Sequence, residues 1–287
     1  MLLVTDLDGT LLTSQKTISP PTRQALIAFR QRGGLLAACS ARPVSSMTRL
    51  LQQQQVATLF GWCAGFNGGQ IIAMSPQQVI HTAALSGMDL RDIDRHISLA
   101  CYDHHFFSAD AIYHRYDRPV APWTRYEAQL FAVPLIAATP VEIVNRRDIY
   151  KITLVGAQEN IDALCAEVTC KLPYGYTATI TGGNYIDIQR SEINKGYAVT
   201  KLSQQLNIPC SQVVAIGDRQ NDISMFAAAG TGIAMGNAPE VVKQQARFIT
   251  TANDDEGIVH ALEWLRCSAH PVTIRQSSTL AENNEPD

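Results

Sequence analysis

The sequence predicts an α/β protein with a Rossmann-like, doubly wound parallel-sheet core and an inserted α+β cap domain. Short apolar strands alternate with helical segments at the start of the chain and again at its end, which is the pattern of a parallel sheet covered by helices. The middle of the chain is rich in aromatic residues and in stretches of alternating polarity, which are typical of an antiparallel sheet. With 287 residues, 46% of them hydrophobic, the chain is long and apolar enough for two domains.

The first segment begins the alternation of strands and helices. Leu2–Thr5 and Leu35–Cys39 are short, continuous apolar runs, as expected of strands buried on both faces. Ser19 is a suitable N-cap for a helix that carries two prolines in its first turn, and a second helix is expected over Val44–Gln53. The order strand, helix, strand, helix predicts the first half of a doubly wound sheet.

The last segment repeats this pattern. Helices are expected at 197–206, 223–229, 239–246 and 256–265, and strands at 213–216, 231–235 and 248–250. We therefore assign residues 1–80 and 190–266 to one discontinuous core, residues 81–189 to the inserted cap, and the polar, unpatterned residues 267–287 to a disordered tail.

The charge balance excludes several classes of protein. There are 23 basic and 26 acidic residues, a formal net charge of -3, so no overall positive field is available to attract nucleic acid or an anionic membrane. No apolar run reaches the length of a membrane span, and the start lacks the basic leader of a signal peptide. We expect a cytoplasmic protein that binds a small molecule at a local site, without nucleic-acid or membrane partners.

Two carboxylates follow the first strand. Asp6 and Asp8 stand two residues apart where the apolar run ends, and a period of two would point both side chains the same way. Ligands of doubly wound sheets bind at this edge, and paired carboxylates suit phosphoryl transfer because one can attack phosphorus while the other moves a proton. Gly9 would let the chain turn sharply. An ordinary strand followed by an Asp-Gly turn is the alternative interpretation.

A second acidic group follows the strand at 213–216. Asp218 is placed to bind a hard cation, and Asp222 lies at the start of the next helix. A helix cap alone would explain Asp222, but it does not explain Asp218. Four acids at one sheet edge would repel one another and take up protons unless a cation lay among them. Mg²⁺ is the expected cation, since it accepts a few carboxylates together with water and phosphate oxygens.

Two further segments add candidates for phosphate binding. Ser40, Ala41 and Arg42 end the second strand and can present a hydroxyl and backbone N–H groups, and Lys195 precedes a helix of the last segment. Each has an ordinary alternative: a serine after a strand is usually a cap, and a lysine before a helix is usually a solvated charge. The order of all four groups along the chain makes the functional interpretation the stronger one.

These four segments resemble the motifs of the haloacid dehalogenase-like superfamily. The matching stretches are DLDGTLL at the N-terminus, the Ser40 position, NKG at 194–196 and GDRQNDISM, with GIAMGNA at 232–238 behind them. They are most similar to the Cof-type phosphatases, which carry a large cap between the second and third motifs. The resemblance covers about residues 1–265.

The resemblance implies roles for individual residues. It makes Asp6 the nucleophile and Asp8 the acid/base, and it makes Asp218 a Mg²⁺ ligand together with the Asp8 carbonyl. The implied metal group is Asp6, Asp8, Asp218 and Asp222, the implied phosphate contacts are Ser40 and Lys195, and Asn221 would help complete the shell. Leu7, Ala41 and Arg42, next to these motif residues, are also expected to contact the substrate, as are the cap residues Asn184 and Tyr185. Ser-Ala-Arg stands where the family usually has Thr-Gly-Arg; serine keeps the hydroxyl, whereas alanine for glycine changes how closely the backbone reaches a phosphate.

The cap is expected to choose the substrate. Residues 81–189 hold none of the four motifs, and their aromatic side chains suit the lining of an organic pocket. Asn184 and Tyr185 precede the return to Lys195, which makes them the candidates for substrate contacts in the cap. His104, His105 and His114 could be imagined as metal ligands, but adjacent histidines point to opposite faces of a strand, and no acid or cysteine accompanies them at ligand spacing.

The sequence therefore predicts a Mg²⁺-dependent phosphatase that forms an aspartyl-phosphate. Its substrate would be a small phosphorylated metabolite such as a sugar phosphate, pyridoxal phosphate or flavin mononucleotide. A phosphomutase of the same superfamily is the nearest alternative. A phosphoryl-accepting signalling module is a more distant one, because a switch needs neither the leaving-group acid Asp8 nor a lid of a hundred residues.

Overall fold

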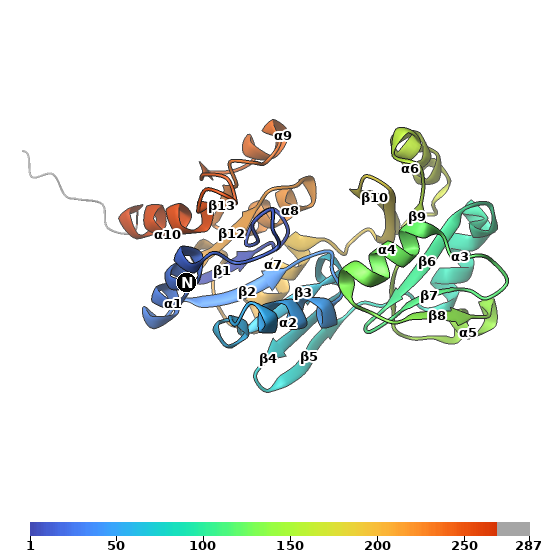
Figure 1. Ribbon diagram of the computed structural model, residues 1–287, viewed down its shortest axis with the longest axis horizontal. Helices are drawn as coiled ribbons and strands as arrows, with labels where there is room; N and C mark the ends of the chain where they lie inside the picture. Colours follow the sequence, from blue (N-terminus) through green and yellow to red (C-terminus); the bar gives the residue numbers. More distant parts are fainter. Residues whose placement is uncertain (269–287) are drawn as a thin grey trace, which may run out of the picture.

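The protein contains two β-sheets that come from different parts of the chain (Figure 1). The computed structural model describes residues 1–268. An eight-stranded sheet lies on one side, and a six-stranded sheet is formed by the chain between its two contributing segments. The mixed α/β fold with a parallel core is confirmed. No helix within residues 1–268 is both long and apolar enough to cross a membrane.

The eight-stranded sheet has the order β14-β13-β12-β1-β2-β3-β4-β5. Its strands are β1 (Leu2–Thr5), β2 (Leu35–Cys39), β3 (Trp62–Gly65), β4 (Gln70–Met74), β5 (Gln77–Thr82), β12 (Val213–Gly217), β13 (Thr231–Ala234) and β14 (Phe248–Ile249). All neighbours are parallel except β3–β4 and β4–β5. Thr5 at the end of β1 is level with Ile216 of β12 and Ala38 of β2, so the residues that follow these three strands emerge side by side.

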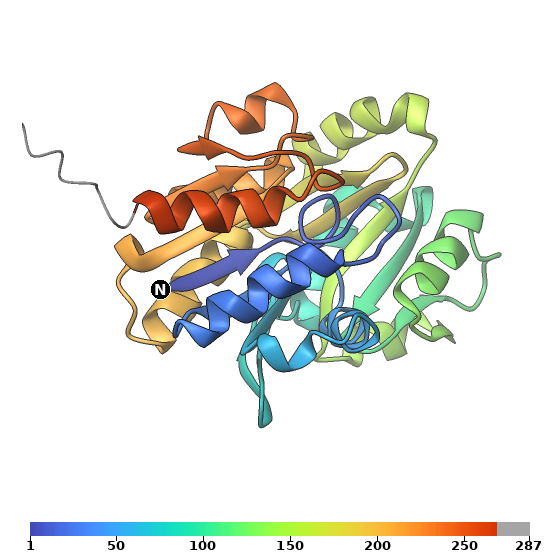
Figure 2. The ribbon, with the colours of Figure 1, turned by 60° about the vertical axis from the view of Figure 1, so that its left-hand side comes forward.

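Helices cover both faces of this sheet. They are α1 (Pro20–Gln31), α2 (Val44–Gln53), α7 (Lys195–Gln205), α8 (Gln220–Ala228), α9 (Glu240–Lys243) and α10 (Gly257–Ser268). Leu3 packs with apolar residues of α1, α2 and α10, and Figure 2 shows α1 in blue beside α10 in red. Leu2 and Val4 pack on the other face with α7, α8 and α9. The alternation within β1 thus separates two hydrophobic cores, as a doubly wound sheet requires.

The six-stranded sheet has the order β10-β11-β9-β6-β7-β8 and is antiparallel except for β7–β8. Its strands are β6 (Asp103–Ser108), β7 (Ile112–Arg115), β8 (Leu135–Ala138), β9 (Ile149–Val155), β10 (Tyr176–Gly182) and β11 (Tyr185–Arg190). Helices α3 (Gly87–Ile97), α5 (Pro140–Asn145) and α6 (Ile161–Lys171) contribute to the apolar cluster on one face. Helix α4 (Pro122–Phe131) lies on the other face, where its Thr124 and Glu127 bond to His105 of β6.

The described residues also include short 3₁₀ turns. They are η1 (Ala57–Leu59), η2 (Phe66–Gly68), η3 (Leu99–Cys101), η4 (Gln158–Asn160) and η5 (Cys210–Gln212).

Several predicted boundaries shift by a few residues. The helix expected from residue 197 starts at Lys195, because the Asn194 side chain accepts the backbone N–H of Tyr197 and caps it. The helix expected over 239–246 is shorter, Glu240–Lys243. The Ser19 cap is confirmed by its bond from the Thr22 N–H, at 3.2 Å. Helix α10 continues through Ser268, and the rest of the predicted disordered tail lies outside the described residues.

Candidate active site

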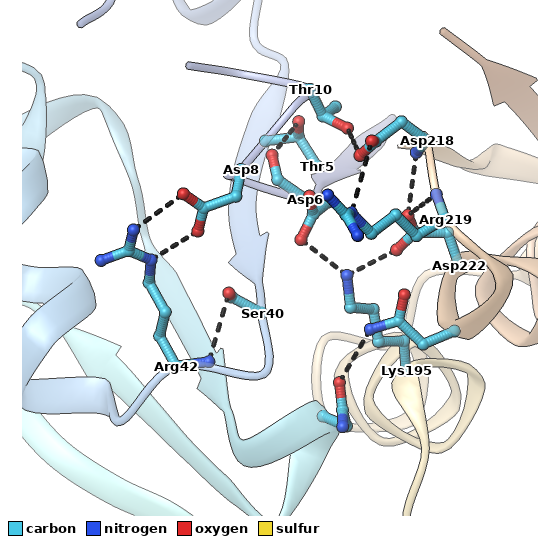
Figure 3. Close-up of polar contacts among 12 residues, drawn as sticks. Thr5, Asp6, Asp8, Thr10, Ser40, Arg42, Lys195, Asp218, Arg219 and Asp222 are labelled. Carbon is cyan, nitrogen blue, oxygen red and sulfur yellow. Dashed lines mark hydrogen bonds and ion pairs between the residues drawn. The ribbon is translucent and has the colours of Figure 1, made fainter. Parts of the chain in front are cut away.

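The polar residues predicted from the sequence gather at the carboxyl ends of β1, β2 and β12. Asp6 directly follows β1 and donates its backbone N–H to the Ile216 carbonyl of β12 at 2.9 Å. Ser40 follows β2, and Asp218 follows β12. The parallel register alone brings these three positions together (Figure 3).

Three of the predicted metal ligands form a compact acidic cluster. Asp6, Asp218 and Asp222 are buried, and each offers a carboxylate oxygen within 4.8 Å of the others. Carboxylate oxygens are the ligands that Mg²⁺ takes in proteins. The donor set therefore fits a divalent hard cation.

Lys195 supplies the positive charge inside this cluster. Its ammonium lies 2.6 Å from Asp6 Oδ1 and 2.5 Å from Asp222 Oδ1, and the side chain is almost fully buried. Burial by itself would lower the pKa of Lys195, but the carboxylates of Asp222 and Asp6 raise it above the ordinary value. The lysine is thus held as a cation at the start of α7.

One buried ammonium does not balance three carboxylates, and the Arg219 guanidinium, 3.8 Å from Asp218 Oδ2, is largely exposed to solvent. Burial raises the pKa of Asp6 to about 7, and the nearby Asp222 and Asp218 add to this rise while Lys195 opposes it. Burial and the Asp222 carboxylate also raise the pKa of Asp218. The cluster without a cation therefore favours a protonated Asp6 below about pH 7, and a divalent cation would favour the carboxylate.

Asp222 also shapes the loop that carries Asp218. Its Oδ2 accepts the backbone N–H groups of Asp218 and Arg219, both at 2.8 Å, while Oδ1 faces Lys195. The two interpretations of Asp222 are therefore compatible. It caps the start of α8 and belongs to the acidic cluster.

The Asp8 carboxylate points away from this cluster, so the expectation that the Asp6 and Asp8 side chains point the same way is wrong. Figure 3 shows Asp8 turned toward Arg42 and Asp6 toward Lys195. The two-residue period holds only within a strand, and β1 ends at Thr5. Arg42 donates to Asp8 from Nε at 2.5 Å and Nη2 at 2.7 Å, and Lys16 donates at 2.8 Å. Burial opposes ionisation, but the bonds from Arg42 and Lys16 lower the pKa of Asp8 to about 2.

Gly9 and Thr10 join the first motif to Asp218. Gly9 has a φ of +82°, and a Cβ there would lie 2.5 Å from Asp218 Oδ2. The Thr10 hydroxyl donates to Asp218 Oδ1 at 2.9 Å. A residue with a side chain at position 9 would be strained and would displace the carboxylate.

The other predicted phosphate contacts have mixed surroundings. Ser40 is buried, and its hydroxyl accepts the backbone N–H of Arg42 at 3.3 Å. The Arg42 guanidinium faces Asp8, and the Leu7 side chain lies in the hydrophobic core. Ala41 lies between Ser40 and Arg42 and is only partly exposed. Leu7 can therefore contact a substrate only through its backbone.

The two cap candidates lie away from the acidic cluster. Asn184 donates to the Gly156 carbonyl at 2.9 Å and braces the turn between β10 and β11. The Tyr185 hydroxyl donates to the Trp123 carbonyl of α4 at 3.0 Å. Their contact with substrate remains a prediction.

The cap histidines do not gather into a metal site within residues 1–268. His105 is fully buried, and its two ring nitrogens contact Thr124 at 3.0 Å and Glu127 at 2.8 Å. The carboxylate partner of His105 is therefore 22 residues away in sequence, which local ligand spacing could not reveal.

Four residues of the site had no role assigned to them from the sequence. Lys16 pairs with Asp8, Thr10 bonds to Asp218, Asn237 donates to the Gly9 carbonyl at 2.9 Å, and Asn67 accepts from Asn221 at 3.2 Å. Thr10 lies in the DLDGTLL stretch and Asn237 in the GIAMGNA stretch, so both had a local signal. Lys16 and Asn67 lie outside the motifs, and their partners are fixed by the tertiary fold.

Comparison with known proteins decides the family. A model of haloacid dehalogenase-like hydrolases matches residues 3–262. The chain belongs to this family. Two Bacillus subtilis relatives, YitU and YwtE, are named 5-amino-6-(5-phospho-D-ribitylamino)uracil phosphatases. They are 25% and 27% identical, and each alignment covers 91% of this chain and 96% of the relative.

Solved structures agree with this assignment. A haloacid dehalogenase-like hydrolase from Bacteroides thetaiotaomicron superimposes with a TM-score of 0.80 at 26% identity, over 92% of this chain and 98% of that one. The HAD subclass IIB sugar phosphatase BT4131 shares the fold, with a TM-score of 0.77 at 21% identity, over 92% of this chain and 98% of that one. This haloacid dehalogenase-like hydrolase is a phosphatase acting on phosphorylated substrates, as predicted. Phosphatases of its superfamily generally use a divalent metal.

The raised pKa of Asp6 predicts a pH-dependent stability. The folded protein without a cation holds a proton on Asp6 up to about pH 7, whereas the ordinary value is 3.8. The free energy of unfolding should therefore fall as the pH rises between these values. Asp6→Asn removes the carboxyl group that causes this loss. Above pH 7 the free energy of unfolding of the variant should therefore exceed that of wild type by at least about 1 kcal/mol, since one pKa unit is worth about 1.4 kcal/mol.

Urea unfolding in excess chelator at pH 5 and pH 8 measures this effect. Asp103→Asn, at an exposed position of β6, is the control and should change neither value. A stability difference between Asp6→Asn and wild type that stays the same at both pH values would contradict the prediction.

Proposed function

We propose that this phosphatase hydrolyses a small phosphomonoester in a Mg²⁺-dependent reaction through an aspartyl-phosphate on Asp6. The observation that carries the proposal is the burial of Asp6 between the Lys195 ammonium and two further carboxylates, at the end of the central strand. A carboxylate held in this way has a cation beside it and a preformed place for a second one. Such a site suits an attack on an anionic phosphate ester.

The proposed metal ligands are Asp6 and Asp218, with Asp222 and the Asp8 carbonyl completing the set. When bound, Mg²⁺ supplies positive charge that balances the carboxylates and the phosphate oxygens. Lys195 contributes the charge that belongs to the chain itself. Ser40 is a proposed polar contact to the phosphate, and Asn221 is proposed to complete the metal and phosphate shell.

In the first half-reaction an Asp6 oxygen attacks phosphorus, and the bond from phosphorus to the leaving oxygen breaks. Asp8 donates a proton to that oxygen. In the second half-reaction Asp8 takes a proton from water, the water oxygen attacks phosphorus, and the bond to Asp6 breaks. Because Arg42 and Lys16 keep Asp8 ionised in this structure, Asp8 can act as an acid only after it has left these partners.

We propose that the segment 81–189 is the cap and that it selects the leaving group. Tyr185 and Gln189 lie on one face of β11 because alternate residues of a strand share a face, and Gln189 reaches the Phe66 carbonyl of the core. Helix α4 lies over the same sheet, and its Phe131 ring lies 5.3 Å from the Arg42 guanidinium. Gln189 and Phe131 on this side therefore contact the core near the catalytic edge, which supports the proposal that this face meets the substrate.

An aromatic group on this side favours a substrate that contains a ring. The rings of Trp123 and Tyr185 are 6.5 Å apart and nearly perpendicular, and Trp123 is 42% exposed. Aromatic side chains contribute specific contacts to planar groups. The two named relatives act on an ester that carries a uracil ring, which supports the same class of substrate here.

Asp6→Asn should abolish turnover of p-nitrophenyl phosphate while the fold is retained. An amide is isosteric with the carboxylate but is not a competent nucleophile, so a loss of at least about a thousandfold in kcat is expected. Steady-state kinetics and circular dichroism measure activity and fold. Asp103→Asn is again the control, and activity of Asp6→Asn within tenfold of wild type would remove Asp6 from this role.

Chelation should abolish activity, and Mg²⁺ should restore it. Ca²⁺ should support the reaction poorly, because it prefers more ligands at longer distances and would misplace the phosphate relative to Asp6. Thermal stabilisation by Mg²⁺ without substrate gives a second readout, and Asp218→Asn should weaken it. Full activity in excess chelator would overturn the metal proposal.

Tyr185→Ala should change kcat/KM unequally among phosphate esters. We expect a loss of about fivefold or more for flavin mononucleotide and pyridoxal phosphate, and a smaller loss for glucose 6-phosphate, since an aromatic contact contributes roughly 1 kcal/mol. The Mg²⁺ requirement should stay unchanged. Tyr174→Ala, at a fully exposed position of the same segment, is the matched control. An equal loss for every ester would report on folding or closure and refute the assignment.

A further inference from the structure

A strained turn, η2 between β3 and β4, contacts both the catalytic edge and the six-stranded sheet. Phe66, Asn67 and Gly68 have consecutive φ values of 52°, 56° and 102°, and all three are buried. The left-handed region is unfavourable for residues other than glycine, and such residues persist where their surroundings hold them. Here the surroundings are the segment 40–42 that follows β2. Phe66 donates its backbone N–H to the Arg42 carbonyl at 3.0 Å, and Asn67 donates its own to the Ser40 carbonyl at 2.9 Å.

The Phe66 ring, from the core segment, packs against residues of the cap. It stacks on Tyr150 with a centroid distance of 4.6 Å and an interplanar angle of 5°. It also meets the edge of Phe107 at 6.2 Å. Both partners belong to strands of the six-stranded sheet. The position of that sheet is therefore coupled to the backbone of the turn.

The Asn67 side chain connects the cap with the catalytic loop. Its Nδ2 donates to Gln189 Oε1 of β11 at 3.1 Å, and its Oδ1 accepts from Asn221 Nδ2 at 3.2 Å. Gln189 in turn donates to the Phe66 carbonyl at 2.9 Å. Asparagine is common in left-handed turns for local reasons, but those reasons do not require a buried side chain with partners on both sides.

The bond to Asn67 fixes how Asn221 is oriented. An amide that donates through its nitrogen presents its oxygen to another partner, and oxygen is the ligand that a hard cation prefers. Asn221 lies between Asp218 and Asp222 in the sequence, on the first turn of α8. Fixing its amide therefore fixes a polar group beside the acidic cluster.

We propose that Asn67 is a positioning residue that fixes the orientation of the Asn221 amide during the reaction. Gln189 bonds to Asn67 from the cap, so this orientation depends on where the cap lies. This inference rests on the proposed function, in which Asn221 contributes to the metal and phosphate shell. When β11 lies in its position against the core, Gln189 is hydrogen-bonded to Asn67. Asn67 in turn orients the Asn221 amide through its own hydrogen bond. The cap thus acts on the chemistry through hydrogen bonds as well as by covering the substrate.

Two substitutions separate the parts of this relay. Asn67→Gly tolerates the left-handed backbone and removes the amide, and Gln189→Ala removes the contact from the cap. Asn67→Gly should lower kcat for p-nitrophenyl phosphate by about tenfold to a hundredfold, the range typical when partners of ligating groups are removed, with a smaller change in KM. It should also raise the Mg²⁺ concentration needed for half-maximal thermal stabilisation measured without substrate.

Gln189→Ala should have a weaker effect in the same direction. Gln189→Glu keeps an oxygen that accepts from Asn67, and it should retain more activity than Gln189→Ala. The double variant Asn67→Gly/Gln189→Ala should be no worse than Asn67→Gly alone, because both changes interrupt one path. Ser203→Ala is the control: Ser203 is a buried residue of α7 whose hydroxyl bonds to the Ile208 carbonyl, and its loss should leave kcat and the Mg²⁺ response unchanged.

Unchanged kcat and Mg²⁺ response in Asn67→Gly, or multiplicative losses in the double variant, would overturn the relay. If Asn67→Gly does not fold, equal activities of Gln189→Ala and Gln189→Glu would overturn it instead. An inactive wild-type protein would refute the proposed function, whereas an active wild type with unaffected variants would refute only this inference.

Discussion

The structure depends on gathering more negative charge at one sheet edge than the chain itself neutralises. Asp6, Asp218 and Asp222 share one buried ammonium, that of Lys195. Burial is unfavourable for the unbalanced carboxylates, as the raised pKa values of Asp6 and Asp218 show. The site therefore remains electrostatically incomplete until cationic charge enters it. That incompleteness is also what suits it to a metal ion and a reactive carboxylate.

The rest of the core keeps these charges in place despite their repulsion. The parallel register of β1 with β12 sets Asp6 beside Asp218, and the Asn194 cap starts α7 so that Lys195 enters the cluster. Close packing fixes the remaining distances. A Cβ on Gly217 would lie 2.3 Å from the carboxyl carbon of Asp222, so only glycine lets this carboxylate fold back over the loop. Two hydrophobic cores hold the sheet rigid on both faces.

The sequence was sufficient for the fold class and for the positions whose chemistry is local. Continuous apolar strands predicted the parallel sheet, and the carboxylates after two of them predicted the acidic cluster. The sequence did not predict that Asp8 pairs with Arg42 and Lys16, because β1 ends before Asp8 and the turn at Gly9 redirects the chain. Asn67 was missed for a related reason. Its partners Gln189 and Asn221 are more than a hundred residues away in sequence and meet it only through the tertiary fold.

The core and the part built on the six-stranded sheet are subject to different physical constraints. The core must hold like charges together, which requires burial, rigid strands and close backbone contacts. Helix α4, over the six-stranded sheet, carries the exposed aromatic side chains of Trp123 and Tyr126, and under the proposed function this part of the molecule selects the substrate. In such a protein, contacts between the two parts are needed for the geometry of the catalytic edge to depend on the position of the cap. The amides of Gln189, Asn67 and Asn221, the first two buried and the third partly buried, span that distance, because a chain of hydrogen bonds keeps its geometry only while both ends are in place.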